Sequence, residues 1–151
     1  MANEIRTKNI AEAAITITLA SLANAASRAS LALDNSTTDY PAALISLDIQ
    51  SGTSAPTAGA VYEVYLLRDV GTIADDGWGG TDAAITIENA PLLGTIVVTA
   101  TASKHFYGIF DTAPLGPLGP TWGIAVKNVS GQALNAAANA AYAMYCVPEV
   151  Q

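Results

Sequence analysis

The chain has few residues that could do chemistry, and its single histidine is the first to consider. A serine-hydrolase triad would need His105 as the base, Ser103 or Ser130 as the nucleophile, and Asp111 to orient the ring. No nucleophile elbow surrounds either serine, and His105 lies in the middle of a strand-like run. The sequence therefore favours a strand histidine at a surface or an interface. We predict that the protein is not an enzyme and has no catalytic residue.

The single cysteine, Cys146, gives no more support for a reactive or metal-binding site. It has no internal disulfide partner, and no motif links it to His105 as a thiolate pair. One cysteine and one histidine cannot fill a tetrahedral zinc sphere without carboxylates. Cys146 lies in an apolar, strand-like run, where cysteine acts as a small hydrophobe. We expect neither a zinc site nor a cofactor.

An acidic, glycine-containing loop is the remaining place where ligands could gather. Asp69, Asp75, Asp76 and Asp82 lie within it, and such carboxylates could supply oxygen ligands to Ca²⁺. The spacing is not that of an EF-hand, and acidic Asp-Gly turns are also ordinary hairpin chemistry. Two readings stay open for Asp75, Asp76 and Asp82, a calcium site or a solvated loop, and we predict no metal ligand.

Two other segments favour contact with a partner molecule. Trp78 stands among glycines in the acidic loop, either exposed as an anchor or folded back as a lid on the end of the sandwich. The segment 113–120 alternates proline with glycine and leucine. Because proline fixes φ, the segment is either a preformed docking strap or a rigid connection. The predicted partner-binding residues are Trp78, Pro114, Leu115, Pro117, Leu118 and Pro120.

Strands must position these residues, because period-2 alternation recurs along the chain. It is clearest at Ile45, Leu47 and Ile49, which alternate with polar residues. The same pattern predicts strands with one wet face and one buried face in the ranges 15–19, 31–34, 85–88, 95–99 and 122–127.

Two further strands, 60–67 and 105–111, are apolar or aromatic on both faces. In a sandwich one face of such a strand packs in the core. We expect the other face to meet a loop or a neighbouring subunit.

Turn signals separate about eight short strands, which predicts an all-β fold, an antiparallel β-sandwich of jelly-roll type. The alanine-rich runs 19–26 and 136–141 would suit helices by propensity. Polar residues interrupt the first, and the second lies between two strands. We predict an extended N-terminal arm over residues 1–13 and a single β-sandwich domain over 14–151.

Composition excludes several classes of function. The formal net charge is −7, and the six lysines and arginines are scattered singly, which argues against nucleic acid and against an anionic membrane surface. Charged residues make up 13% of the chain and apolar residues 51%, which favours a surface partly covered by other subunits. The start of the chain does not read as a secretory signal, and no stretch reaches the length of a membrane span, so we expect synthesis in the cytoplasm.

Four segments in fixed order carry a resemblance. They are Ala60 to Asp69 (AVYEVYLLRD), the acidic glycine loop Asp75 to Asp82, Asn89 to Ile96 (NAPLLGTI) and Val126 to Leu134 (VKNVSGQAL). This order resembles small jelly-roll structural proteins from the virions of tailed bacteriophages, over about the last ninety residues. The segment 114–120 departs from the resembled pattern because it is longer.

The resemblance implies a virion structural protein, a capsid decoration or cement protein that binds and stabilises the outside of the head. Its implied partners are the major capsid protein and copies of itself, as a dimer or trimer. The implied location is the capsid surface, after synthesis in the host cytoplasm. The alternative is a tail or fibre-tip protein that binds a host glycan, with Trp78 stacked on a sugar.

Overall fold

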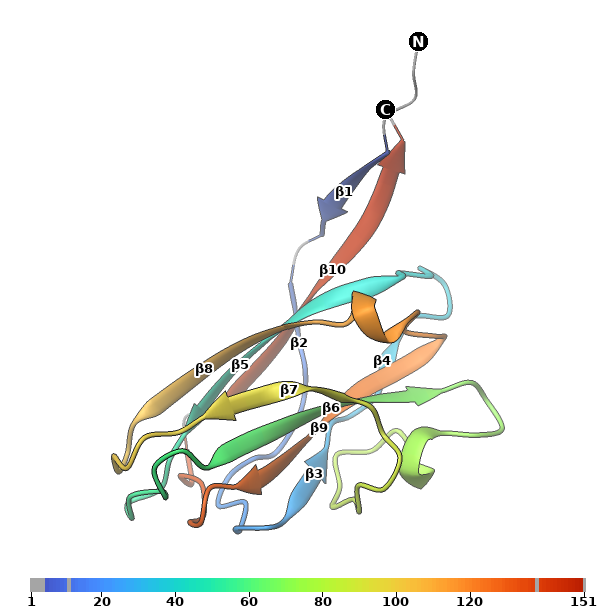
Figure 1. Cartoon of the computed structure of the whole chain (residues 1–151). Helices are drawn as coiled ribbons and strands as arrows, with labels where there is room; N and C mark the ends of the chain where they lie inside the picture. Colours follow the sequence, from blue (N-terminus) through green and yellow to red (C-terminus); the bar gives the residue numbers. More distant parts are fainter. Residues whose placement is uncertain (1–4, 11, 138, 151) are drawn as a thin grey trace.

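The computed structural model describes residues 5–10, 12–137 and 139–150, which fold into two antiparallel β-sheets packed face to face (Figure 1). Sheet A has the order β1-β10-β5-β8, and β2 also pairs with β10. Its strands are β1 (Ile5–Asn9), β2 (Ala13–Ala14), β5 (Ala42–Gln50), β8 (His105–Asp111) and β10 (Ala140–Val150). Sheet B has the order β3-β9-β6-β7, and β4 also pairs with β9. Its strands are β3 (Ser27–Ala29), β4 (Leu33–Asp34), β6 (Val61–Asp69), β7 (Leu92–Val97) and β9 (Thr121–Val129).

The connectivity is that of a jelly roll, which confirms the predicted fold class. The chain crosses back and forth between the sheets, except that the consecutive strands β6 and β7 are neighbours in sheet B. The first strands pair with the last one, and β5 lies between β10 and β8. All pairings are antiparallel. β1 and β2 occupy one strand position beside β10, and β3 and β4 occupy one beside β9. Ten short strands therefore fill the eight positions of the double Greek key.

The core lies between the sheets and follows the predicted alternation where the strands are long. In β5, Ile45, Leu47 and Ile49 are buried, and they pack in one cluster with Tyr62 and Val64 of β6. The residues between them in β5 face outward and are half-buried. The period-2 pattern identified this strand because one face meets the opposite sheet and the other does not.

Two of the predicted strands are wrong, although their apolar residues pack against the sandwich and are buried or half-buried. Segment 15–19 runs beside the sandwich outside any strand, held by single bonds such as that from the Ile15 amide to the Ala141 carbonyl (2.8 Å). Ile85 and Ile87 pack against the outer side of sheet B from a segment outside the named strands. Alternation marks burial of every second residue, and an irregular segment lying on a sheet produces it too.

The predicted wet face of β9 is also wrong. Ala125 is fully buried together with Val126, because the loop between β6 and β7 covers the outer face of sheet B. Strand β6, predicted to be apolar on both faces, meets the same loop, and Leu67 is buried beneath it. The expectation that a loop covers the second face is confirmed for β6.

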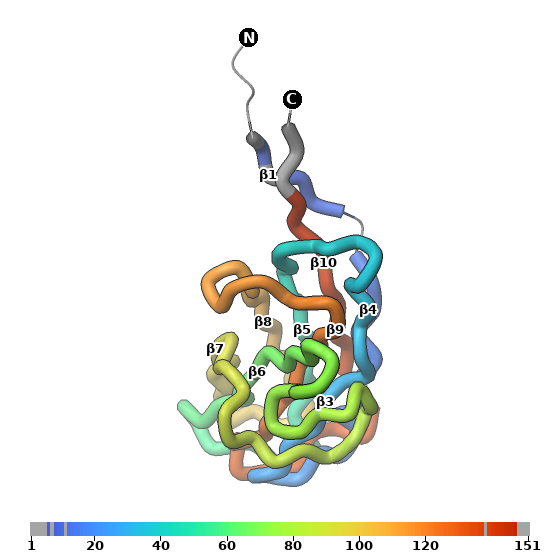
Figure 2. Tube along the Cα trace, turned by 90° about the vertical axis from the view of Figure 1, so that its right-hand side faces the viewer, coloured from blue at the N-terminus to red at the C-terminus, as the bar shows by residue number. Residues whose placement is uncertain are grey.

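The two ends of the described chain form a ribbon that extends beyond the sandwich (Figures 1 and 2). Strand β1 pairs with β10 from Ile5 opposite Val150 to Asn9 opposite Cys146. The pairing of β10 with β5 ends at Cys146 opposite Ala42, so the outer part of the ribbon has two strands. The predicted N-terminal arm therefore includes strands that run along β10. A short helical turn, η2 (Ala113–Leu115), lies at the same end of the sandwich.

Candidate functional site

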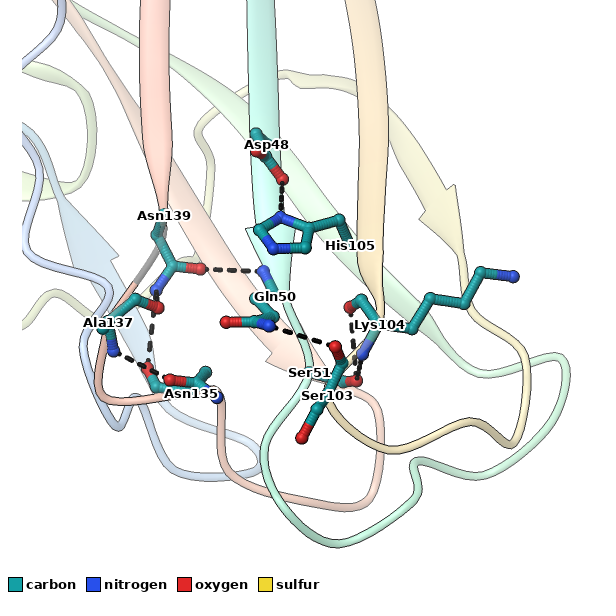
Figure 3. Close-up of polar contacts among 9 residues, drawn as sticks. All are labelled: Asp48, Gln50, Ser51, Ser103, Lys104, His105, Asn135, Ala137 and Asn139. Atoms are coloured by element: carbon teal, nitrogen blue, oxygen red, sulfur yellow. Dashed lines mark hydrogen bonds and ion pairs between the residues drawn. The ribbon is translucent and has the colours of Figure 1, made fainter.

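His105 forms a pair that the sequence did not indicate. Its Nδ1 lies 2.7 Å from Oδ1 of Asp48 on the neighbouring strand β5 (Figure 3). The Tyr107 ring lies nearly parallel to the imidazole, with the ring centroids 6.2 Å apart. Asp48 lies opposite Tyr107 and His105 lies opposite Gln50, so Asp48 and His105 are diagonal neighbours on the outward face of sheet A. Asp111, the predicted orienter, instead accepts a hydrogen bond from the Ala113 amide.

The structure does not bring the candidate nucleophiles to this histidine. Ser130 is buried at the end of β9, where its hydroxyl donates to Asn128 Oδ1 at 2.6 Å and lies 3.1 Å from the Gln132 carbonyl oxygen. The carbonyl of Ser103 accepts a bond from the Gln50 side chain, and Ser51 holds the Lys104 backbone (Figure 3). Within the described residues, the side-chain partner of His105 is Asp48 and not a serine. The His105–Asp48 pair therefore links strands β8 and β5, and the predicted members of a serine-hydrolase triad are not brought together.

The aspartates of the acidic loop are each used by a different part of the fold. Asp76 accepts from the backbone amides of Glu88, Asn89 and Ala90 and so closes the loop on itself. Burial raises the pKa of Asp76, but the three amides outweigh it, and the pKa lies below its ordinary value.

Asp82 and Asp75 contact neighbouring strands, whereas Asp69 accepts from the Gly71 amide at 2.7 Å in the adjoining turn. Asp82 accepts from Arg28 on β3 and from Thr18, and these bonds lower its pKa against the opposing effect of burial. Asp75 accepts from the Arg68 backbone at 3.0 Å. Across residues 5–10, 12–137 and 139–150, no three acidic, histidine or cysteine side chains gather as a metal cluster.

Trp78 is a lid, so the reading of this residue as an exposed anchor is wrong. Its side chain is 4% exposed and lies over Gly123 of β9, where an added Cβ would stand 2.7 Å from the ring. The indole Nε1 donates to the Ser30 carbonyl at 3.1 Å. Since the ring is buried in its own subunit, it offers no surface to a partner.

The proline segment lies across the ribbon end of the sandwich. Pro114, Pro117 and Pro120 are exposed, Leu115 is half-buried, and Leu118 is fully buried and anchors the segment in the core. Arg68 donates to the Leu115 carbonyl, and Asn35 donates to the Gly119 carbonyl at 2.9 Å. The segment is thus held from both sides as a strap, with its prolines facing outward.

Three shallow hollows meet at Pro117. The largest, of about 520 Å³, lies at the base of the ribbon and is lined by Pro41, Ala113, Cys146 and Val147 among others. The second is lined by the exposed Val70 and Ile73, and the third lies beside Tyr40. We call this hollowed, mainly apolar region the ribbon-end surface. The sequence indicated its strap but not Val70 and Ile73, which come from a tight turn without periodicity.

A second apolar surface lies on the outward face of β8. Tyr107 and Ile109 are 71% and 75% exposed, and Ser46 of β5 lies between Ile109 and Tyr142 in the register. The sequence predicted that this strand is apolar on both faces. In the described chain no loop covers its outer face as the β6–β7 loop covers sheet B.

Comparisons of the chain with protein-family models, with curated proteins and with solved structures find no match. No helix within the described residues is long and apolar enough to cross a membrane.

Proposed function

We propose that the chain is a structural protein of a tailed-bacteriophage virion, a decoration or cement protein that binds and stabilises the outside of the head. The resemblance of residues 60–134 to such proteins motivates the proposal, and the jelly-roll topology agrees with it. The observation that carries it is the ribbon-end surface. A rigid strap, hollows that meet at Pro117 and a projecting ribbon form one end of the subunit.

The ribbon-end surface has the features of a protein contact. Val70 and Ile73 are 69% and 74% exposed beside the strap, and solvated apolar residues grouped in this way usually mark a partner site. The strap is preordered, so binding loses little conformational entropy there. An isolated two-stranded ribbon is marginally stable in water, and a partner that covers it would stabilise it.

The charges around this surface indicate the chemistry of the partner. Asp39 and Asp111 are exposed at the rim of the hollows, and Asp69 is half-buried nearby. Arg68 lies in the second hollow but is paired with Asp75, and the basic residues Arg6 and Lys8 lie on the ribbon. Major capsid protein with an apolar patch and a basic rim would complement it. The subunit would act mechanically, by bridging neighbouring capsid proteins through many contacts of about 25 cal/mol per Å² of buried apolar area.

Binding to isolated heads tests the proposal. Purified chain is mixed with tailed-phage heads that lack it, and bound protein is measured by co-sedimentation at several salt concentrations. Pro117→Lys puts a charge where the three hollows meet and should weaken binding at least about tenfold. Thr53→Lys, in the exposed turn between β5 and β6 at the other end of the sandwich, is the matched control and should bind as wild type. Equal binding of both variants, or none by wild type, would contradict the proposal.

The alternative of a tail or fibre-tip protein that binds a glycan has less support. It relied on Trp78 as a stacking platform, and that ring is buried under its own loop. Glycan binding by the wild-type chain that survives Trp78→Phe would locate a sugar site elsewhere on the surface.

A further inference from the structure

The edge of sheet A at β8 has unpaired backbone groups. The Thr112 amide donates to the Ala43 carbonyl, and the Ser51 amide donates to the Lys104 carbonyl, one at each end of an unbroken register with β5. In an antiparallel pair, alternate residues direct both backbone groups to the neighbour. The even-numbered residues of β8 therefore face β5, and His105, Tyr107, Ile109 and Asp111 direct their N–H and C=O groups away from it.

The other sheet edges are blunted in ways that natural proteins use against edge pairing. Strand β1 carries Arg6 and Lys8, and the edge strands β3 and β4 have three and two residues. The pairing of β7 with β6 has a register shift at Val64 and Tyr65. By contrast β8 is a regular strand of seven residues with no proline or lysine, and it is uncharged from Phe106 to Phe110. Such an edge is an aggregation hazard unless something covers it.

The sequence of β8, HFYGIFD, is complementary to itself when reversed. We propose that two copies of this chain pair antiparallel through β8 about a two-fold axis at Gly108, which joins the two A sheets into one continuous sheet. The partner strand is β8 of a second copy, because its outward N–H and C=O groups and its side chains complement those of the first copy.

In this register every outward-directed N–H and C=O group of β8 has a partner on the second copy. Tyr107 lies opposite Ile109 of the second copy, and His105 lies opposite Asp111 of the second copy. These four residues are the ones that direct their N–H and C=O groups outward, so each pair exchanges two backbone hydrogen bonds. A register centred one residue away leaves one of the four without a partner from this set.

The side chains agree with the same register. The pair of Tyr107 with Ile109 joins an aromatic and a β-branched residue, a favourable cross-strand combination. His105, which Asp48 holds within its own subunit, lies opposite Asp111 of the second copy, so no two carboxylates stand directly opposite each other across the axis. On the outer face the exposed Tyr107 and Ile109 side chains of both copies come together across the axis, which shields them from water.

The inference rests on the proposed function in one respect, because it assigns the surface for the self-association that this function includes. The residues that test it, Tyr107 and Ile109, line none of the three hollows that meet at Pro117. If the chain does not bind heads, dimerisation through β8 can still be observed. If the chain does not dimerise, its binding to heads can still be measured.

Sedimentation velocity over a concentration series tests the pairing. Wild type should be a dimer that dissociates on dilution. Tyr107→Lys and Ile109→Glu should each raise the dimerisation Kd by about tenfold or more, since each replaces both symmetry-related pairs. In the double variant the introduced lysine and glutamate lie opposite each other only if the axis is at Gly108, so the double variant should recover the dimer. Both positions are exposed, and thermal melts should show that the variants fold; Thr53→Lys is the control that should dimerise normally.

Amide hydrogen exchange gives an independent readout. The Tyr107 and Ile109 amides should exchange slowly at concentrations where the dimer forms, and the Ile109 amide should exchange fast in Tyr107→Lys. A wild type that is monomeric at all concentrations overturns the inference. So does a dimer that the single variants leave unchanged, or a double variant as weak as the single ones.

Discussion

Trp78→Ala is the substitution that best separates a lid within the subunit from an anchor for a partner. The Trp78 ring closes the outer face of sheet B over Gly123, and its Nε1 donates to the Ser30 carbonyl. If the ring is a lid, its loss must lower the stability of the isolated subunit. An anchor would leave the isolated subunit unchanged and weaken a complex.

The expected cost follows from burial and one hydrogen bond. Replacing a buried tryptophan by alanine costs about 3–5 kcal/mol in all, of which the lost hydrogen bond accounts for about 1 kcal/mol. The small cluster around Trp78 lies under a loop that can settle, so we expect a total near the lower bound, about 3 kcal/mol. For a domain of this size that lowers Tm by about 6–12 °C.

Urea unfolding followed by circular dichroism measures this directly, at two protein concentrations so that any association shows as a shift. Trp78→Phe keeps most of the ring and should cost about 1 kcal/mol, mainly the bond to Ser30. Ile73→Ala, in the same loop but 74% exposed, is the control and should change stability by less than about 0.5 kcal/mol. A Trp78→Ala variant as stable as Ile73→Ala would refute the reasoning.

Three further predictions follow from single contacts. The folded-state pKa of Asp76 lies below 3.8, so the stability that the carboxylate contributes is present above that pH and is lost as pH falls through the folded pKa. The difference in unfolding free energy between wild type and Asp76→Asn should therefore be constant at neutral pH and shrink below about pH 4. A difference that does not change with pH would contradict this prediction. Gly123→Ala places a Cβ 2.6 Å from Ser30 Oγ and should cost about 1–3 kcal/mol in urea unfolding, whereas an unchanged midpoint would mean that the loop moves away freely. Alkylation of Cys146 with a bulky maleimide fills the largest hollow and should weaken head binding as Pro117→Lys does, with unmodified Cys146→Ser as the control that still binds.

The fold class could be predicted from the sequence because a long strand with one buried face and one exposed face alternates apolar and polar residues. Ile45, Leu47 and Ile49 alternate with polar residues, and β5 has that structure. Residues in irregular segments gave the same signal, so Ile85 and Ile87 were assigned to a strand although their segment only lies against sheet B. Alternation records which residues are buried, and backbone pairing is a separate property that depends on the neighbouring chain.

The candidate surfaces were less predictable because they depend on which loop covers which sheet. A tryptophan flanked by glycines is typical of an exposed anchor, and only the packing of the Trp78 ring over Gly123 shows that it covers sheet B. The prediction that β8 has an apolar outer face was made from its sequence, but its unpaired edge follows from the strand order. The pair of His105 and Asp48 required the β5–β8 register, which no spacing in the sequence gives.

Copy number in purified tailed-phage virions, measured by quantitative mass spectrometry against the major capsid protein, tests the central claim most directly. The proposed decoration function predicts an equimolar ratio or a simple fraction of it. A handful of copies per particle would indicate the tail or neck and contradict the head assignment, and absence from particles would refute a virion role altogether.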